Sequence, residues 1–329
     1  MDELADSRIF PYQPNKIAPL VFAAAFSLSL AVHIFQAYKA RAKFMLVLIF
    51  ATAFQILGYL CRWVAEGVLV GISTSALFHI FYIIAHFFSL LDRKIAAENG
   101  SSGIFIVSQT CIVAAPSFSA AQDYMIIGRM MSYVGSESTF ISHSIVTKLF
   151  VFIDIVCVLT QSTGIAMLTM GSGGPDSMST GRGILIFGLF LQIASFVIFL
   201  FIAILFDRKS LSLHRDKIEL KRLRPLFTAF YISAVLIIGR CVYRAIEFTM
   251  MDFAHLDDDY LFTHEWPIYA LDGFPILIAT VVFNICNPAW YLPRKKGLRM
   301  DGSQEGTRKH WWSRVKTAQS QEHMMEGGR

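Results

Sequence analysis

Long hydrophobic segments separated by short polar stretches run along most of the chain. Eight of them can be distinguished, at residues 17–38, 44–64, 76–91, 104–128, 148–170, 183–206, 226–248 and 267–289. A helix needs about 20 predominantly apolar residues to cross the hydrocarbon core of a bilayer, and five or six of the segments clearly reach that length. The pattern therefore predicts an all-α, polytopic membrane protein, built as one bundle of helices.

Three basic stretches decide which segments cross the membrane. Lys and Arg are concentrated in residues 39–43, 207–225 and 290–329, and the positive-inside rule places all three stretches on the cytosolic face. Two stretches share a face only if an even number of helices separates them. Counting every segment gives five crossings between the first two stretches, whereas leaving out the short, histidine-containing segment 76–91 gives four. We therefore predict a seven-transmembrane helix bundle with the N-terminus outside and the C-terminus in the cytosol, and a re-entrant or interfacial helix at 76–91.

This topology divides the chain into an external segment, a membrane domain and a cytosolic tail. The predicted parts are 1–16 outside, 17–289 in the membrane with 68–93 as a doubtful extra apolar segment, and 290–329 as a basic, disordered tail. Residues 65–103 become one external stretch, which contains the chain's single sequon, Asn99-Gly100-Ser101. Asn99 is therefore a predicted glycosylation site. The Gly- and Ser-rich stretch 171–182 is predicted to be a flexible external loop.

Composition agrees with a membrane protein and adds little chemistry. Hydrophobic residues make up 55% of the chain and only 16% is charged, whereas soluble domains average about 25% charged residues. Each of the five cysteines lies in an apolar segment and none forms a CxxC pair. This placement favours buried small hydrophobic residues over a disulfide framework or a metal site.

The polar residues inside the apolar segments are the candidate site. A charge at the centre of a bilayer costs about 2.5–3.5 kcal/mol on insertion scales, so such residues face the bundle interior and have partners. Arg240, Arg244 and Glu247 are spaced i, i+4 and i+7 on one stripe of a helix. The predicted topology brings them to the depth of three other ionisable residues, which gives an outer cluster of Arg62, Arg240, Arg244, Glu247, Glu265 and Asp272. Its three positive and three negative groups are predicted to pair.

A second, sparser polar set is predicted deeper in the bundle. Its members are Asp154 and Gln161 in the fourth span, Gln192 in the fifth, and Asp123, Tyr124 and Arg129 toward the cytosolic end of the third. The two sets either line a functional polar cavity or serve as structural ion pairs and interhelical hydrogen bonds. Hydrogen bonding between helices is the favoured role of the two glutamines. Close helix contact is predicted at three glycines, Gly164, Gly188 and Gly239.

No sequence pattern indicates an enzyme. The chain lacks the GxxxxGK[ST] phosphate-binding loop and the GxSxG nucleophile motif, and its histidines do not have the spacing of a helical metal site. We therefore expect a non-enzymatic protein with no cofactor, no metal ion and no nucleic-acid partner. A membrane-embedded lipid enzyme stays open as a minor alternative.

Short motifs occur in a defined order along the chain. They are Tyr12-Gln13-Pro14; His33 and Gln36; Gly58-Tyr59 with Arg62; Ala115-Pro116 with Phe118, Ala120, Ala121, Tyr124, Gly128 and Arg129; Asp154, Gln161 and Gly164; Gly188-Leu189 with Gln192; Arg240, Tyr243, Arg244 and Glu247; and Glu265, Tyr269, Asp272, Pro275 and Pro288. In this order, over residues 10–292, they resemble the fungal lipid-translocating exporter family, also called the RTA-like (resistance-to-aminocholesterol) family. Two features depart from the family pattern. Gln55 stands where the family usually has an acid, and residues 68–93 look inserted, as an unspliced intron would be.

The resemblance implies a seven-helix fungal membrane protein that exports sphingoid long-chain bases or sterol-like amphiphiles and confers resistance to toxic amphiphiles. We expect it in the plasma membrane, with another endomembrane as the alternative. Its partners would be membrane lipids or amphiphilic small molecules. On this interpretation the outer cluster receives or releases an amino or zwitterionic headgroup, and Asp154 carries a proton. The alternative is a seven-helix receptor or sensor that regulates lipid asymmetry or a stress response.

Overall fold

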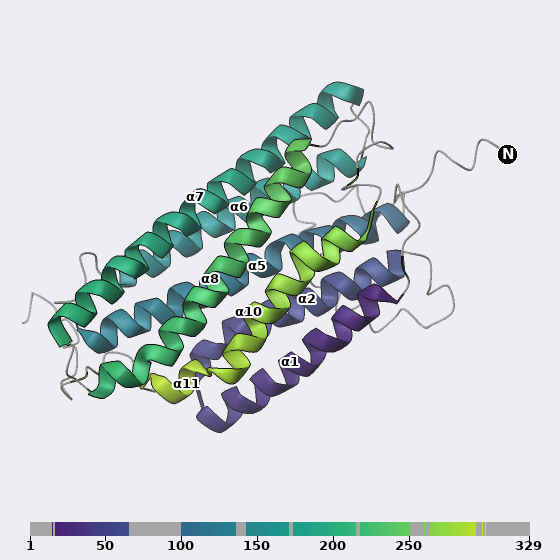
Figure 1. Ribbon diagram of the computed structural model, residues 1–329. Coiled ribbons are helices and arrows are strands. Elements are labelled where there is room, and N and C mark those ends of the chain that lie inside the picture. The colour runs from purple at the N-terminus through teal and green to yellow at the C-terminus, as the bar shows by residue number, and fades with distance from the viewer. Residues whose placement is uncertain are drawn as a thin grey trace, which may run out of the picture.

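The computed structural model describes residues 15, 17–65, 100–135, 143–170, 174–214, 218–250, 260, 264–293, 298 and 300, and these form an all-helical protein (Figure 1). Its long helices are α1 (Ala18–Ala40), α2 (Leu46–Ala65), α5 (Gly100–Val134), α6 (His143–Met170), α7 (Gly174–His214), α8 (Ile218–Met250) and the π-helical η4 (Ile268–Gly273) continuing into α10 (Phe274–Ile285). Two short helices, η1 (Lys43–Met45) and α11 (Pro288–Tyr291), complete the described chain. The predicted all-α class is confirmed.

The long helices coincide with the seven predicted spans, in the same order. Six of them are long and apolar enough to cross a bilayer, namely α1, α2, α6, α7, α8 and the unit from η4 to α11. The remaining helix, α5, is not among these six and carries the polar residues Gln122, Asp123 and Arg129. The chain is therefore an integral membrane protein of several spans.

Neighbouring helices in the sequence are also neighbours in space. The order α1, α2, α5, α6, α7, α8, α10 forms a ring, and α5 also contacts α8 inside it (Figure 1). A polar seam closes the ring between α1 and α10, where Asn284 Nδ2 donates to Ser29 Oγ over 2.6 Å and Asn287 Nδ2 donates to Gln36 Oε1 over 3.0 Å. Buried polar side chains come from every long helix of the ring, and α5 and α8 supply Asp123, Arg240, Arg244 and Glu247.

The contacts between α2 and α5 test the predicted topology. Phe54 packs against Phe118 with 4.9 Å between ring centroids, whereas Ser108 Oγ donates to the Gly58 carbonyl over 2.9 Å. Residue numbers increase along α2 as they decrease along α5, so the two helices are antiparallel. The chain thus leaves α2 and enters α5 at the same end of the bundle, as the seven-span prediction requires. The predicted re-entrant segment 76–91 and the predicted glycosylation site Asn99 lie outside the described residues, as do most of the tail and of the segment 1–16.

Helices continue past the apolar segments, so the predicted loop at 171–182 is wrong. Residues 171–182 were expected to be a flexible loop, yet α7 begins at Gly174. The basic stretch 207–225 is also largely helical, since α7 runs to His214 and α8 begins at Ile218. The 41 residues of α7 span about 60 Å, twice the thickness of the hydrocarbon core. Beyond the apolar part, Asp207 joins the two helices by an ion pair of 2.9 Å to Arg224 and a hydrogen bond of 3.1 Å from the Tyr231 hydroxyl.

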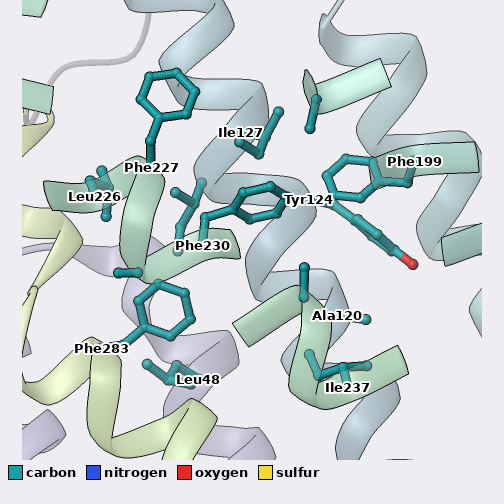
Figure 2. Close-up of a cluster of buried hydrophobic side chains, with 14 of the residues drawn as sticks. Leu48, Ala120, Tyr124, Ile127, Phe199, Leu226, Phe227, Phe230, Ile237 and Phe283 are labelled. Atoms are coloured by element: carbon teal, nitrogen blue, oxygen red, sulfur yellow. The ribbon is translucent and has the colours of Figure 1, made fainter. Parts of the chain in front are cut away.

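Aromatic side chains fill the centre of the ring, where α5, α7 and α8 meet (Figure 2). The Tyr124 ring lies edge-on against Phe199 at 4.4 Å and near Phe150 at 5.6 Å, and Phe199 in turn contacts Phe230. These fully buried rings fix the position of the Tyr124 hydroxyl, which projects beyond them.

Close contact between α6 and α7 depends on two of the three predicted glycines. A Cβ on Gly164 would lie 2.7 Å from the Gly181 carbonyl oxygen, and a Cβ on Gly188 would meet the Thr160 side chain. The prediction of close contact is therefore confirmed at these two positions. At Gly239 it is wrong, because a Cβ there has no atom of the described chain within 4 Å.

Gly164→Ala is expected to destabilise the protein by about 1–3 kcal/mol, a typical cost of overpacking. The new methyl group would meet the backbone, at the Gly181 oxygen and the Leu185 nitrogen, so relief requires α6 and α7 to separate. Gly239→Ala is the matched control, and it should be neutral or slightly stabilising because alanine favours helix. Thermal unfolding of the purified variants in detergent measures both effects, and equal midpoints would show that this helix contact is not tight.

Candidate functional site

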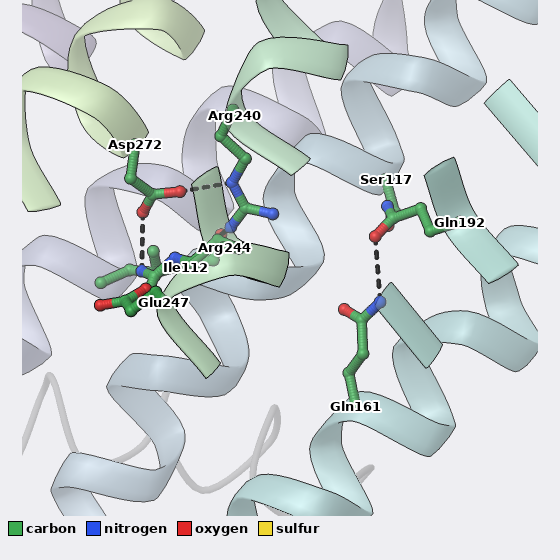
Figure 3. A network of polar contacts seen from close by, with 8 residues as sticks. All are labelled: Ile112, Ser117, Gln161, Gln192, Arg240, Arg244, Glu247 and Asp272. Carbon is green, nitrogen blue, oxygen red and sulfur yellow. Dashed lines mark hydrogen bonds and ion pairs between the residues drawn. The ribbon is translucent and has the colours of Figure 1, made fainter. Parts of the chain in front are cut away.

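Four buried ionisable side chains form one network near the end of α8 (Figure 3). Asp272 accepts from the Arg240 Nε on one carboxylate oxygen and from Arg244 Nη2 on the other, the latter over 2.8 Å. Arg244 Nη1 also donates to Glu247 Oε2 over 2.9 Å. None of the four side chains is more than 4% exposed. We call Arg240, Arg244, Glu247 and Asp272 the ion network.

Local sequence places these four groups. The i, i+4 and i+7 spacing on α8 turns the two arginines and Glu247 to the ring interior, as predicted. Asp272 lies in the π-helical turns of η4, between Pro267 and Pro275, where the wider turns leave the usual α-helical register. Arg240 Nη2 donates further to the Ile112 carbonyl on α5 over 3.2 Å. The ion network therefore joins α8 and η4, which are consecutive in the described chain, to the distant α5.

Arg62 and Glu265 form a second pair beside this network. Arg62 Nη2 lies 3.4 Å from Glu265 Oε1, and the Tyr269 hydroxyl donates to the same oxygen over 2.8 Å. Tyr59 connects the two parts, since its ring stacks near Tyr269 and its hydroxyl lies against Gly273, next to Asp272. The structure thus brings all six predicted members of the outer cluster together. Their three positive and three negative charges balance.

Two glutamines and a serine form a chain of hydrogen bonds across three helices (Figure 3). Gln161 Nε2 donates to Gln192 Oε1 over 3.0 Å, and Gln192 Nε2 donates to Ser117 Oγ over 2.8 Å. The predicted interhelical hydrogen bond is confirmed. Gln161 and Arg244 also line the same narrow cleft. The other side chains that line this cleft are apolar, namely Val113, Ile165, Leu185, Leu189 and Phe248. The glutamine pair is therefore adjacent to the ion network.

A third group of polar side chains lies farther along the same helices, between α5, α6 and α8. Asp123 is fully buried, and its Oδ2 accepts from Ser233 Oγ over 2.9 Å. Asp154 is 3% exposed, and the Tyr124 hydroxyl lies beside its carboxylate. We call Asp123, Tyr124 and Asp154 the inner acidic group. All three belong to the second polar set predicted from the sequence.

Arg129 does not join any of these groups. Its guanidinium lies over the Phe44 ring, 4.1 Å from the ring centroid. Its Nη1 donates a hydrogen bond to the Pro293 carbonyl oxygen over 3.4 Å. Both contacts are at the end of α5 opposite to the ion network. The polar track expected from the sequence therefore stops short of Arg129.

Sequence reasoning missed several uncharged members of the site. Ser117, Ser233 and Tyr269 each complete one of the contacts above. Tyr269 stood among the family motifs without an assigned role. Single serines in apolar segments are common, so only helical spacing from the charged residues could have singled out Ser117 and Ser233. The prediction for the cysteines holds, because all five are free and four of them are fully buried.

The sequence model of the family described as RTA1 like protein matches residues 80–295. The match begins inside the doubtful segment 68–93 and covers the ion network, the glutamine pair and the inner acidic group. No solved structure matches the chain.

Three curated relatives are similar over large parts of the chain. The lipid-translocating exporter-like protein RTA1 of Leptosphaeria maculans is 24% identical over 91% of this chain and 54% of its own length. Protein RTA1 of Saccharomyces cerevisiae is 30% identical over 56% of each chain. The sphingoid long-chain base transporter RSB1 of Saccharomyces cerevisiae is 26% identical, again over 56% of each chain. The chain thus spans little more than half the length of these relatives, and the names of the first and third denote transporters rather than enzymes.

Proposed function

Because this chain belongs to the RTA1-like family, we propose that it is a membrane transporter that moves single-chain lipids or related amphiphiles outward across a bilayer. The substrate classes are sphingoid long-chain bases and sterol-like amphiphiles, and resistance to toxic members of these classes follows from their export. The printed names of two relatives, an exporter-like protein that translocates lipid and a sphingoid long-chain base transporter, support this choice. We assign no covalent chemistry to the chain.

The observation that carries the proposal is a lane of polar side chains inside an apolar bundle. The ion network, the glutamine pair and the inner acidic group follow one another along α5, α6 and α8. On α5 the lane runs from Ile112 to Asp123, which corresponds to about 17 Å along a helix axis. That length is roughly half the thickness of the hydrocarbon core.

Such a lane lowers the main barrier to lipid translocation. Transfer of a polar or charged headgroup from water into pure hydrocarbon costs several kcal/mol or more, whereas the apolar tail of the lipid is stable there. Hydrogen-bonding side chains along the lane can replace part of the headgroup's water, while the tail stays in the surrounding lipid. The outer faces of α1, α6 and α7 carry exposed Leu, Ile and Phe side chains that suit contact with lipid tails.

Orientation and location belong to the same proposal. We place the protein in the plasma membrane, with the N-terminus and Asn99 outside and the basic tail in the cytosol, on the strength of the positive-inside rule. The ion network then lies toward the outer surface and the inner acidic group nearer the cytosol. Outward movement would begin at the inner group.

A reconstitution experiment tests the proposed transport. Purified protein in liposomes should accelerate the transbilayer movement of a fluorescent long-chain base, measured by extraction of the probe with albumin. Protein-free liposomes and liposomes with heat-denatured protein are the controls. Folded protein that leaves the rate of probe movement unchanged would contradict a transporter and favour the seven-helix receptor or sensor.

A further inference from the structure

The charges of the membrane domain balance in one place and not in another. The outer cluster contains three arginines and three carboxylates that pair with one another. The inner acidic group contains two carboxylates, and no basic side chain of the described chain contacts either of them. Arg240 on α8 donates instead to Asp272 and to the Ile112 carbonyl. A positive charge is therefore missing at the inner group.

Hydrogen bonding is also incomplete there. Both oxygens of Asp154, one oxygen of Asp123 and the Tyr124 hydroxyl have no hydrogen bond of ordinary geometry within the described residues, although the hydroxyl lies beside Asp154. Cys157 on its own helix and Cys241 on α8 lie near Asp154, and the Phe196 and Phe199 rings on α7 contact Tyr124. None of these supplies a positive charge.

An ionised carboxylate with no counter-charge is unstable in a medium of low dielectric constant. It must hold either a proton or a cation. An ammonium group carries three N–H donors, which match the unused acceptor atoms of Asp154 and Tyr124, and the surrounding aromatic rings favour a cation as well. A proton satisfies the charge without using the remaining acceptors.

We propose that Asp154, with Tyr124 beside it and Asp123 as the second carboxylate, binds the ammonium group of a single-chain amine inside the membrane and holds a proton when the amine is absent. Binding of the ammonium releases the proton of Asp154, so loading of the amine and loss of the proton are coupled one to one. The assignment rests on the proposed transport function, and it moves amine recognition away from the arginine-rich outer cluster.

The test measures binding separately from transport. Full-length protein in nanodiscs is titrated with radiolabelled octadecylamine, with unlabelled octadecanol as the neutral competitor of equal chain length. Wild-type protein should prefer the amine at least tenfold, and its affinity for the amine should fall as the pH is lowered, because protons compete for Asp154. Asp154→Asn should remove both the preference and the pH dependence.

Asp207→Asn is the matched control, because Asp207 is a buried carboxylate that already has Arg224 and Tyr231 as partners. It should keep the amine preference. Amine binding by folded Asp154→Asn within twofold of wild type would overturn the inference and leave the transport proposal standing. Wild-type protein that binds the amine through Asp154 yet moves no lipid would sustain the inference about the site and overturn transport.

A second measurement needs no variant. Dicyclohexylcarbodiimide reacts with protonated carboxyl groups inside membranes, and mass spectrometry locates the resulting adduct. Wild-type protein should be labelled at Asp154, octadecylamine should prevent the labelling without itself being coupled to Asp154 as an amide, and octadecanol should not prevent it. Labelling of Asp154 that the amine leaves unchanged would contradict the proposal even if Asp154→Asn failed to fold.

Discussion

Asp272→Ala is expected to lower the free energy of unfolding by about 3–5 kcal/mol, the usual cost of removing one partner from a buried ion pair. Asp272 is 2% exposed and is the carboxylate shared by Arg240 and Arg244. Its loss leaves Arg240 with no carboxylate and Arg244 with Glu247 alone. The two guanidiniums, which both lie inside the ring, would then repel each other without the charge that now separates them.

The yield of folded monodisperse protein and the thermal midpoint in detergent measure this effect. Glu265→Ala is the comparison, because the Arg62–Glu265 pair is longer, at 3.4 Å, and the Glu265 side chain is 10% exposed. It should cost clearly less than Asp272→Ala. If both variants unfold at the wild-type midpoint, the outer cluster does not stabilise the fold.

Arg244→Ala should come close to the effect of Asp272→Ala, whereas Arg244→Lys should fold and yet transport poorly. Arg244 uses two different nitrogens to hold Asp272 and Glu247 at once. A lysine keeps the charge but loses the planar fork, so it can hold one of these carboxylates well but not both. Loss of one hydrogen bond between charged groups costs about 1.5–3 kcal/mol.

Probe movement in liposomes, normalised to folded protein, separates the two roles of Arg244. Arg224→Lys is the control, because the Arg224 side chain is 36% exposed and its pair lies beyond the apolar segments, where such pairs contribute about 0–1 kcal/mol. Full transport by Arg244→Lys would limit Arg244 to a general electrostatic role.

Exchanging the charges of residues 244 and 272 should not rescue folding, since Glu247 and Arg240 would each face a like charge.

The outer cluster and the inner acidic group have different functions in this proposal. The outer cluster is neutral and internally paired, so it stabilises the bundle and can act as a closed end of the lane. The inner group lacks a counter-charge, so it depends on an exchangeable proton or cation. Loss of the first should show in the thermal midpoint, and loss of the second in the affinity for amines.

The sequence by itself determined the number, order and alternating direction of the helices. Segments of about 20 apolar residues are typical of helices that span a bilayer, and the positive-inside rule relates the charge of each loop to its side of the membrane. The prediction that 76–91 does not cross agrees with the antiparallel contact of α2 and α5. Burial of the Arg240, Arg244 and Glu247 stripe was equally predictable, because helical spacing alone puts three charged residues on one face.

Only the tertiary structure decided which of these residues meet. A hydropathy profile marks only the apolar part of a helix. It therefore could not show that α7 begins as early as Gly174, because backbone hydrogen bonds extend the helix into polar sequence as well. The rotation and register of the helices do not follow from composition. They place Asp272 between two arginines and Arg129 over the Phe44 ring, and they leave no atom close to a Cβ at Gly239. The missing counter-charge at Asp123 and Asp154 is likewise a property of packing, because a carboxylate's partners are set by every helix that surrounds it.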